Sequence, residues 1–330
     1  TSSTTSVTAT SSSMVTDPGL LASLLQLMPS QQYYYPQMVT QAVLVQHLAL
    51  QAKLAAQHEV KLVQVMEACQ SSETSLGMEA RREMVQELDI LVKQWVRSEG
   101  LRQGLNWTQV EKLGGKVVTY GSFRLGVVDR DSDLDLLAVV PRHVTRDDFF
   151  QEFYMHLAKR PEVSELRALS KAYVPVIKFK YKDIDVDLTV ARLMGGVSLP
   201  DSEDYLTQDA ATRDLDPRCL RSLNGYRATR ELLQLVPDVA KFQTVLRLVK
   251  LWARRQGIYG NMLGFLGGAS WAILVTSAAK MEAERQGQDN NPVHLVYLFF
   301  KVCLMDRLFK WRIIEVVKGS PNCSLLPTLF

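Results

Sequence analysis

The sequence predicts an α+β protein, in which a mixed β-sheet flanked by helices is followed by an all-helical region. Five short segments with strand-like alternation or β-branched runs lie between residues 116 and 190, and an amphipathic helix precedes them. Beyond residue 201 the alternation stops, and apolar residues recur at helical spacing instead. Strand segments followed by helical segments indicate two packed cores.

Four parts are expected along the chain. Residues 1–36 open with a Ser/Thr run and end on three tyrosines and a proline, a composition that buries too little surface to fold, so disorder is expected. Residues 37–72 are rich in Ala, Leu, Val and Gln, which favours N-terminal helices. Residues 73–205 contain the predicted sheet, and residues 206–330 contain the predicted helical domain. A chain of 330 residues with 47% apolar content is long enough for two such cores.

Composition excludes several classes of protein. With 38 basic and 35 acidic residues the net charge is only +3, so any contact with nucleic acid depends on local clusters. The four cysteines, at positions 69, 219, 303 and 323, are far apart, which is typical of reduced thiols and not of a zinc site or a disulfide framework. No apolar run approaches the roughly 18 residues that a membrane span needs. The first basic residue is Lys53, so an export leader is not expected.

Each element follows from its own pattern. The helix before the sheet has an apolar stripe at i, i+3, i+4 spacing that is expected to pack on the strands: Met84, Val85, Leu88, Leu91, Val92 and Trp95. Strands are predicted at residues 116–120, 134–140, 165–169, 174–181 and 184–190, with a helix across residues 147–159. The later helices are predicted at residues 218–235, 239–256, 269–285 and 293–310.

Residues 120–140 carry the most specific chemistry. A Gly-Ser turn at Gly121 and Ser122 is followed by Asp133 and Asp135, two carboxylates at i, i+2 spacing. On a strand these side chains project from one face, roughly 7 Å apart along the backbone, with oxygens that are able to converge. Carboxylates bind hard cations such as Mg²⁺, which also bind substrate phosphates. Because Gly121 permits close approach of backbone amides and Ser122 adds a hydroxyl, the segment predicts a site for a metal and a triphosphate.

A third carboxylate is expected from a later strand. Asp183, Asp185 and Asp187 are spaced by two and would all face one way, so their periodicity does not choose among them. Asp187 is the best candidate, because the chain continues from it into the core. Asp183, in contrast, follows a predicted hairpin turn.

Several segments, in order, are similar to one known family. They are residues 114–127 (Gly-Gly-Lys-Val-Val-Thr-Tyr-Gly-Ser-Phe-Arg-Leu-Gly-Val), 140–150, 174–178 (Val-Pro-Val-Ile-Lys), 223–229 (Leu-Asn-Gly-Tyr-Arg-Ala-Thr), 250–255 (Lys-Leu-Trp-Ala-Arg-Arg) and 264–272 (Gly-Phe-Leu-Gly-Gly-Ala-Ser-Trp-Ala). Through them the chain resembles the eukaryotic poly(A) polymerases, within the nucleotidyltransferase superfamily related to DNA polymerase beta. The resemblance implies a nucleotidyltransferase domain at residues 73–205 and a helical middle domain at residues 206–330, on which the N-terminal helices of residues 37–72 would pack.

The resemblance also implies roles for individual residues. The catalytic metal carboxylates of the family fall on Asp133, Asp135 and Asp187. Together with the Gly-Ser turn, the positions expected to bind nucleotide are Gly121, Ser122, Val174, Lys178, Asn224, Lys250, Tyr259, Asn261, Gly268 and Ala269. Val174 and Lys178 match positions near both the primer terminus and the nucleotide.

Basic residues gather on the helix predicted at residues 239–256. Arg247, Lys250 and Arg254 lie three and four apart on one face. For Arg254 and Arg255 a solvated basic face is expected. Lys250 lies among large apolar residues, and the family has a lysine at this place that contacts the triphosphate. A charge there would stabilise the leaving pyrophosphate.

Some residues depart from the family pattern. The segment Val128-Asp129-Arg130-Asp131 replaces a His-Gly-Pro-Gly-like turn and adds charge beside the predicted metal site. Ala269 replaces a valine near the adenine pocket, which is expected to weaken packing on the base by about 1 kcal/mol. Tyr173 replaces a phenylalanine. Similarity fades after Lys280, and the chain ends before the position of the family's C-terminal RNA-binding domain, which would therefore be lacking or cut off.

The function that the resemblance implies is template-independent addition of AMP from ATP to the 3′-hydroxyl of RNA, as in mRNA polyadenylation. Two Mg²⁺ or Mn²⁺ ions are expected, with Asp187 both a ligand and the proton acceptor. The expected partners are the RNA 3′ end, ATP and cleavage and polyadenylation factors, without a membrane. A monomer in the nucleus is expected, with the cytoplasm as the alternative. Two other functions stay open: another nucleotidyltransferase, uridylyl-adding or oligoadenylate-forming, and a catalytically silent RNA-processing scaffold.

Overall fold

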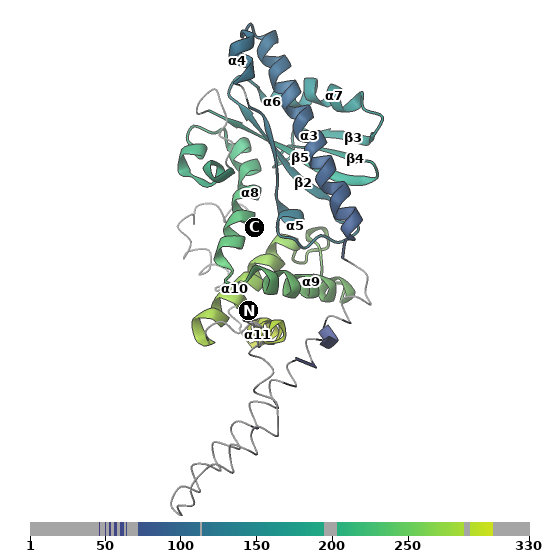
Figure 1. Cartoon of the computed structure of the whole chain (residues 1–330), viewed down its shortest axis with the longest axis vertical. Coiled ribbons are helices and arrows are strands. Elements are labelled where there is room, and N and C mark those ends of the chain that lie inside the picture. Colours follow the sequence, from purple (N-terminus) through teal and green to yellow (C-terminus); the bar gives the residue numbers. More distant parts are fainter. Residues whose placement is uncertain are drawn as a thin grey trace, which may run out of the picture. The chain divides into compact units, whose positions relative to one another are not determined.

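The structure is a computed structural model of the whole chain (Figure 1). It describes residues 72–112, 114–194, 203–286 and 291–305, together with isolated positions between 46 and 64, which are helical. The chain divides into two units, residues 1–64 and 65–330, and each is considered by itself. The predicted disordered segment, residues 1–36, lies outside the described residues. The elements that follow all belong to the second unit.

A five-stranded mixed sheet forms the centre of this unit. Its strands are β1 (Lys116–Thr119), β2 (Leu134–Pro141), β3 (Val163–Leu169), β4 (Val176–Tyr181) and β5 (Ile184–Leu193). Their order is β1-β2-β5-β4-β3. Only β2 and β5 run parallel, whereas the other neighbours are antiparallel. All five predicted strands are therefore present, and the largest difference from their predicted bounds is that β5 ends three residues later than expected.

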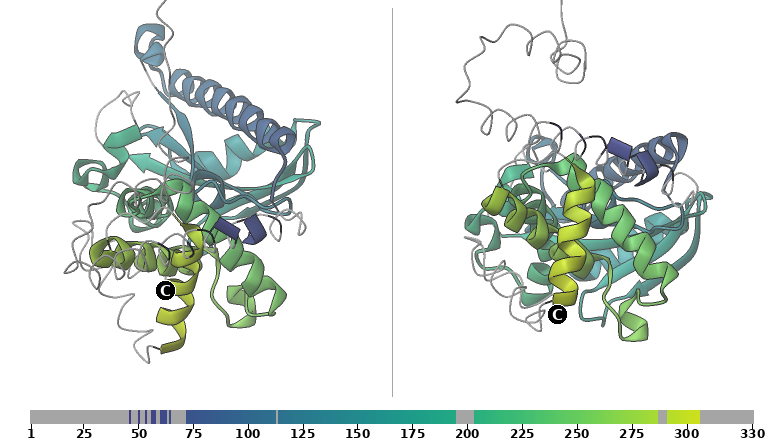
Figure 2. Two further views of the ribbon diagram at one scale, coloured as in Figure 1. Left: turned by 60° about the horizontal axis from the view of Figure 1, so that its bottom comes forward. Right: turned by 90° about the horizontal axis from the view of Figure 1, so that it is seen from below.

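One face of the sheet is covered by the amphipathic helix α3 (Ser75–Arg102). Thr74 caps this helix, because its side chain accepts a hydrogen bond from the Gly77 amide at 3.0 Å. The predicted apolar stripe packs into the core on this face together with residues from β2, β4 and β5: Met84, Leu88, Leu91, Val92, Trp95, Leu134, Leu136, Ile177 and Leu188. Figure 2 shows α3 above the sheet and the later helices below it.

The predicted helix across residues 147–159 consists of three consecutive segments. They are α6 (Arg146–Asp148), a π-helical turn η1 (Phe149–Phe153) and α7 (Tyr154–Ala158). The π turn presents Phe149 and Phe153 to Trp95, and the two phenyl rings stack with centroids 5.6 Å apart. These buried rings attach the segment to the same core as α3.

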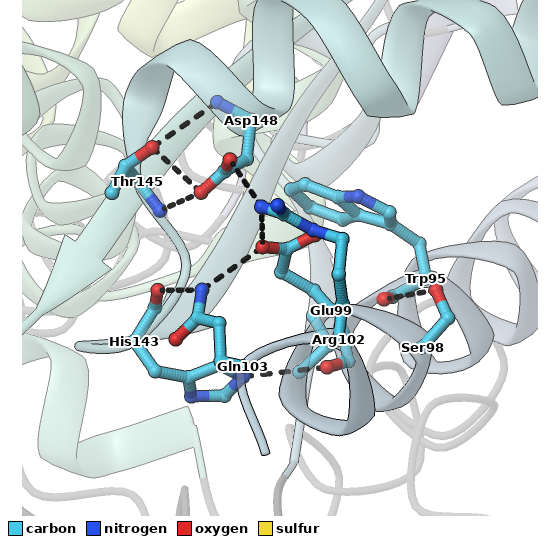
Figure 3. A network of polar contacts seen from close by, with 9 residues as sticks. Trp95, Ser98, Glu99, Arg102, Gln103, His143, Thr145 and Asp148 are labelled. Carbon is cyan, nitrogen blue, oxygen red and sulfur yellow. Dashed lines mark hydrogen bonds and ion pairs between the residues drawn. The ribbon is translucent and has the colours of Figure 1, made fainter. Parts of the chain in front are cut away.

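A polar network joins the end of α3 to the chain that follows β2 (Figure 3). Arg102 donates to Glu99 at 3.0 Å and forms an ion pair with Asp148 at 3.3 Å. Gln103 donates to Glu99 and to the backbone carbonyl of His143, both at 2.9 Å. Because Glu99 is only 3% exposed, these donors supply the partners that a buried carboxylate needs. The network holds the C-terminal end of α3 to the segment that follows β2, and it contains none of the predicted site residues.

The second face of the sheet is covered by α8 (Pro217–Leu235). Further helices are α9 (Val239–Arg255), α10 (Gly268–Gln286) and α11 (Pro292–Met305), which confirms the all-helical region. A buried charge network ties them together, since Glu282 contacts Lys241 at 2.6 Å and His294 at 2.7 Å. None of the described helices is both long enough and apolar enough to cross a membrane.

Short elements were not predicted. They are α4 (Trp107–Glu111), α5 (Gly121–Arg124) and the 3-10 turns η2 (Glu203–Thr207), η3 (Asp209–Thr212) and η4 (Asn261–Leu263). The segment expected as a Gly-Ser turn is thus the start of a one-turn helix, α5. A single helical turn has too few residues to show an apolar period, which is why the sequence pattern did not indicate it.

Candidate active site

Three carboxylates converge on the face of the sheet that α8 covers. Asp135 on β2 lies directly opposite Asp187 on β5, and Asp133 immediately precedes β2. Each offers an oxygen that lies within 4.8 Å of the others. Because strand side chains alternate, the neighbours of Asp135 point to the α3 core while Asp135 points to the other face. The structure therefore brings together the three carboxylates that the sequence singled out.

The other two carboxylates of the later strand are not part of this group. Asp185 lies opposite Lys180 in the sheet. Asp183 lies in the hairpin turn between β4 and β5, with a positive φ of 67°. The register of β2 against β5 is what distinguishes Asp187, and register is not visible in the local pattern of one strand.

The cluster is electrostatically unfavourable without a cation. Burial and the charges of Asp133 and Asp187 raise the pKa of Asp135 to about 8. Burial also raises the pKa of Asp187, although its ion pair with Lys178 acts in the opposite direction. Converging carboxylates that resist ionisation in this way are stabilised by a hard divalent ion, whose charge replaces the protons. The donor set, oxygen only, fits Mg²⁺ or Mn²⁺.

Gly121 leaves space for this cluster. Its φ is +61°, and a Cβ at this position would lie 2.0 Å from a carboxylate oxygen of Asp135. Its amide donates to the Thr229 hydroxyl on α8 at 3.1 Å, and Thr229 in turn donates to the Gly225 carbonyl. The start of α5 is therefore held against both the carboxylate cluster and α8, and only glycine fits there.

Gly121→Ala is expected to weaken Mn²⁺ binding by at least about tenfold, because the new methyl group displaces the Asp135 carboxylate. Binding of Mn²⁺ is followed by electron paramagnetic resonance. Gly104→Ala is the matched control, since Gly104 also has a positive φ (+85°) but nothing within 4 Å of its added Cβ. Equal Mn²⁺ affinity in the two variants would contradict the assignment of Asp135 as a ligand.

A cavity of about 540 Å³, here called the central cavity, opens beside the cluster. The sheet side contributes Gly121, Ser122, Asp133 and Asp135, and the helical side contributes α8, α9 and α10 residues. The predicted residues from the helical side are Lys250, Tyr259, Asn261, Gly268 and Ala269. Nine of the thirteen predicted site residues thus line one cavity, which is large enough for a nucleotide.

Two polar side chains in the central cavity suit an anionic ligand. The Ser122 hydroxyl is buried and finds no hydrogen-bond partner among the described residues. Lys250 is 3% exposed and donates to the carbonyl of Val127 at 2.8 Å. A buried hydroxyl donor and a buried cation beside a carboxylate cluster are the groups that a phosphate sharing a metal ion with the carboxylates would need.

The other predicted residues line two smaller cavities that meet the cluster at Asp187. Lys178 and Asp187 line a cavity of about 360 Å³ on the sheet, with Arg167 and Glu165. Val174 and Asn224 line one of about 320 Å³, again with Asp187. Val174 lies just before β4, not within it as predicted. Asp187 therefore lines both smaller cavities and lies beside the carboxylates that line the central cavity.

Sequence reasoning missed two contributors to this region. Thr229 holds the Gly121 amide across 108 positions of sequence, and no local pattern indicates such a contact. Arg254 was expected on a solvated face, but it pairs with Asp129 at 2.6 Å and lies over the Tyr259 ring at 4.8 Å. Arg254 is exposed, as expected for a solvated face, but its pairing with a distant loop was not predicted.

Comparisons with known proteins agree with this geometry. Residues 48–236 match the family described as poly(A) polymerase nucleotidyltransferase domain, and residues 241–318 match the poly(A) polymerase central domain. The chain is 42% identical to poly(A) polymerase pla1 of Schizosaccharomyces pombe over 63% of the chain and 37% of that protein. It is 40% identical to nuclear poly(A) polymerase 1 of Arabidopsis thaliana over 67% of the chain and 30% of that protein. The chain thus spans less than two fifths of the length of these relatives.

A solved structure of Cid1, described by its RNA terminal uridylyl transferase activity, has a similar fold. The TM-score is 0.50 at 16% sequence identity, over 75% of this chain and 72% of that one. At this identity the likeness concerns the arrangement of sheet and helices alone.

Proposed function

The chain belongs to the poly(A) polymerase family, and we propose that it transfers AMP from ATP to the 3′-hydroxyl of RNA without a template. The observation that carries the proposal is the carboxylate cluster at the edge of a nucleotide-sized cavity that also contains Lys250 and Ser122. One wall of this cavity holds a cation site and another holds a lysine, which is the arrangement that a metal-bound triphosphate requires.

In this proposal the triphosphate lies between α5 and α9. Ser122 donates its free hydroxyl to a phosphate oxygen, and Lys250 offers the donor that neither the Val127 carbonyl nor Asp129 uses. Lys250 then stabilises the charge on the leaving pyrophosphate, at the end of the cavity away from the RNA. Gly121 lets the chain approach the α-phosphate closely.

The metals of the reaction are proposed to be two Mg²⁺ ions, or Mn²⁺, held by the three carboxylates. Asp133 and Asp135 would bind both ions, and Asp187 one of them. The bound ions would lower the pKa of the attacking hydroxyl and neutralise the leaving group. Among the described residues, these three aspartates form the group of ligating side chains that could hold a metal ion.

RNA is proposed to approach from the side of Asp187. Lys178 forms an ion pair with Asp187, and it lies opposite Arg167 on β3, so two basic residues follow the acidic cluster across the sheet. Such a row suits a primer whose backbone phosphate contacts the basic side chains while its 3′-hydroxyl reaches Asp187. Asp187, with its raised pKa, is the proposed acceptor of the hydroxyl proton.

Adenine is proposed to lie against Tyr259, Asn261 and Ala269, at the helical end of the central cavity. Ala269 leaves room there for a larger apolar side chain. Ala269→Val is therefore expected to lower the KM for ATP by about fivefold, through roughly 1 kcal/mol of added apolar packing. Steady-state kinetics at saturating primer measure this change. A KM that is unchanged or raised would indicate that the base binds elsewhere. The control is the Kd for primer RNA, which should stay constant.

The partners are proposed to be the RNA 3′ end, ATP and cleavage and polyadenylation factors, with the protein a monomer. A nuclear location is proposed because the Arabidopsis relative is named as a nuclear enzyme. The boundaries of the domains, residues 73–205 and 206–330, remain part of the same proposal.

The function is tested with an unstructured RNA primer, Mg²⁺ and ATP labelled at the α-phosphate. The proposal predicts label in the RNA, one pyrophosphate released for each AMP added, and no reaction with a primer that ends in a 3′-deoxynucleotide. Label transfer to protein instead of RNA, or release of ADP or phosphate, would contradict nucleotidyl transfer to the 3′-hydroxyl.

A further inference from the structure

Asp129 is a buried carboxylate in the loop between α5 and β2. It is 6% exposed, and the loop is closed on itself, because the Ser132 hydroxyl accepts from the Asp129 amide at 3.1 Å and the Ser132 amide donates to the Asp129 carbonyl at 3.0 Å. On the other side, Asp129 pairs with Ser72 as an isolated β-bridge. Its position is therefore fixed by backbone contacts, and it lies four residues before the metal ligand Asp133.

One oxygen of this carboxylate contacts two cations of α9. Oδ2 of Asp129 lies 2.9 Å from Nζ of Lys250 and 2.6 Å from a guanidinium nitrogen of Arg254. Both cations line the central cavity, whereas Asp129 does not. The two cations therefore lie between the cavity and the carboxylate, and a ligand in the cavity would face their positive charge.

Each cation has donors left for a ligand. An ammonium group has three donors, and Lys250 uses two of them on Asp129 and the Val127 carbonyl. Arg254 is held by Asp129 on one side and lies over the ring of Tyr259, another residue of the central cavity, at 4.8 Å. Asp129 therefore determines where the lysine, the arginine and, through the arginine, the tyrosine are placed.

We propose that Asp129 is a positioning residue for the nucleotide: its carboxylate fixes Lys250 and Arg254 behind the triphosphate. This inference rests on the proposed function, since it names the residue that organises the triphosphate end of the same cavity. Asp129 does not contact the nucleotide.

The charges around Lys250 make a counter-charge necessary. Burial lowers the pKa of Lys250, and Arg254 and Arg247 on the same helix lower it further, whereas Asp129 raises it. The residues of α8 and α10 that line the cavity are uncharged, and the carboxylates of Asp131, Asp133 and Asp135 also line it, from the sheet side. Without Asp129, the buried ammonium group of Lys250 would lie near Arg254 and Arg247 without this counter-charge, which disfavours its protonated form.

The experiment uses Asp129→Asn, which keeps the size of the side chain and removes its charge. The Kd of a fluorescent ATP analogue is expected to rise by about tenfold near pH 8, the loss of one charge-assisted contact, and by less near pH 6.5, because a lower pH favours the protonated form of Lys250. The Kd for primer RNA should not change. Asp209→Asn is the matched control, because Asp209 also contacts a buried arginine, Arg227, but is 88% exposed and outside the three cavities.

A double-mutant cycle separates positioning from general damage. In the Lys250→Met background, Asp129→Asn is expected to raise the Kd for the ATP analogue by no more than about twofold, because most of its effect passes through the lysine. A full tenfold loss in that background would overturn the inference and indicate a structural role. Tighter binding of the analogue by the single variant would also overturn it, since Asp129 would then repel the triphosphate.

The cycle also distinguishes this inference from the proposed function. If the wild-type chain adds no AMP but binds the analogue with the predicted dependence on Asp129 and pH, the nucleotide site stands and the transfer reaction is wrong. If AMP is added but Asp129→Asn leaves analogue binding unchanged at both pH values, the reaction stands and the inference is wrong.

Discussion

Asp135→Asn is expected to abolish AMP addition and, at the same time, to raise the melting temperature of the metal-free protein. The activity falls by at least about a thousandfold, because the carboxylate supplies several kcal/mol of stabilisation through the metals. The fold gains stability because a buried carboxylate among like charges is replaced by a neutral amide of the same shape. Primer extension and thermal unfolding in a chelator measure the two effects.

The pH dependence of this gain follows from the sign of the shift. The pKa of Asp135 is raised from an ordinary value of 3.8 to about 8, so within this range the folded state holds a proton that the unfolded state has released. The stability contributed by this group therefore decreases as the pH rises from about 4 to about 8. The asparagine side chain does not titrate, and the advantage of the variant should increase over the same range.

Asp183→Asn is the control for Asp135→Asn. Asp183 is exposed in the β4–β5 turn at a positive φ, a conformation that asparagine adopts readily. Its variant should keep both the activity and the melting temperature of the wild type. Retained AMP addition by Asp135→Asn, or a lower melting temperature near pH 8, would contradict the place given to Asp135 in the cluster.

Lys250→Met is expected to lower kcat/KM for ATP by about 10- to 100-fold, the range for one hydrogen bond to a charged group. The methionine keeps the apolar stem within the cavity wall and removes the charge from the triphosphate. Both KM and kcat should change, since the role proposed for the lysine is to bind the ground state and to stabilise the leaving pyrophosphate. The Kd for RNA should stay constant.

Lys93→Met is the matched control for this variant. Lys93 also pairs with an aspartate, Asp89 at 2.6 Å, but it lies on α3, on the opposite face of the sheet. An unchanged kcat/KM for ATP in Lys250→Met would indicate that Lys250 is only a structural partner of Asp129.

The main elements of the fold could be predicted because their signals are local. The α3 stripe and the strand-like runs along β2, β4 and β5 extend over several turns or pleats, and the structure has a helix and three strands at these places. The π turn at Phe149 could not be predicted. It adds about one residue to a single turn, and the spacing of apolar residues changes visibly only beyond its five residues.

The site was predicted where its residues are close in sequence or share a family motif. Asp133 and Asp135 stand two apart, so alternation alone puts them on one face. The partnership of Asp129 with Lys250 and Arg254 spans more than a hundred residues and depends on how the loop after α5 meets α9. The sequence identified the added charge in that loop, but only the tertiary structure assigns it to two cations of the central cavity.

The most direct test of the account is primer extension with each nucleoside triphosphate supplied separately, with an unstructured RNA primer and Mg²⁺. The cavity that Tyr259, Asn261 and Ala269 line predicts a ladder of added residues with ATP and at most traces with UTP, GTP or CTP. A ladder with UTP would indicate a uridylyl-adding enzyme. The absence of extension with all four nucleotides would contradict the assignment of the cluster and the central cavity to catalysis.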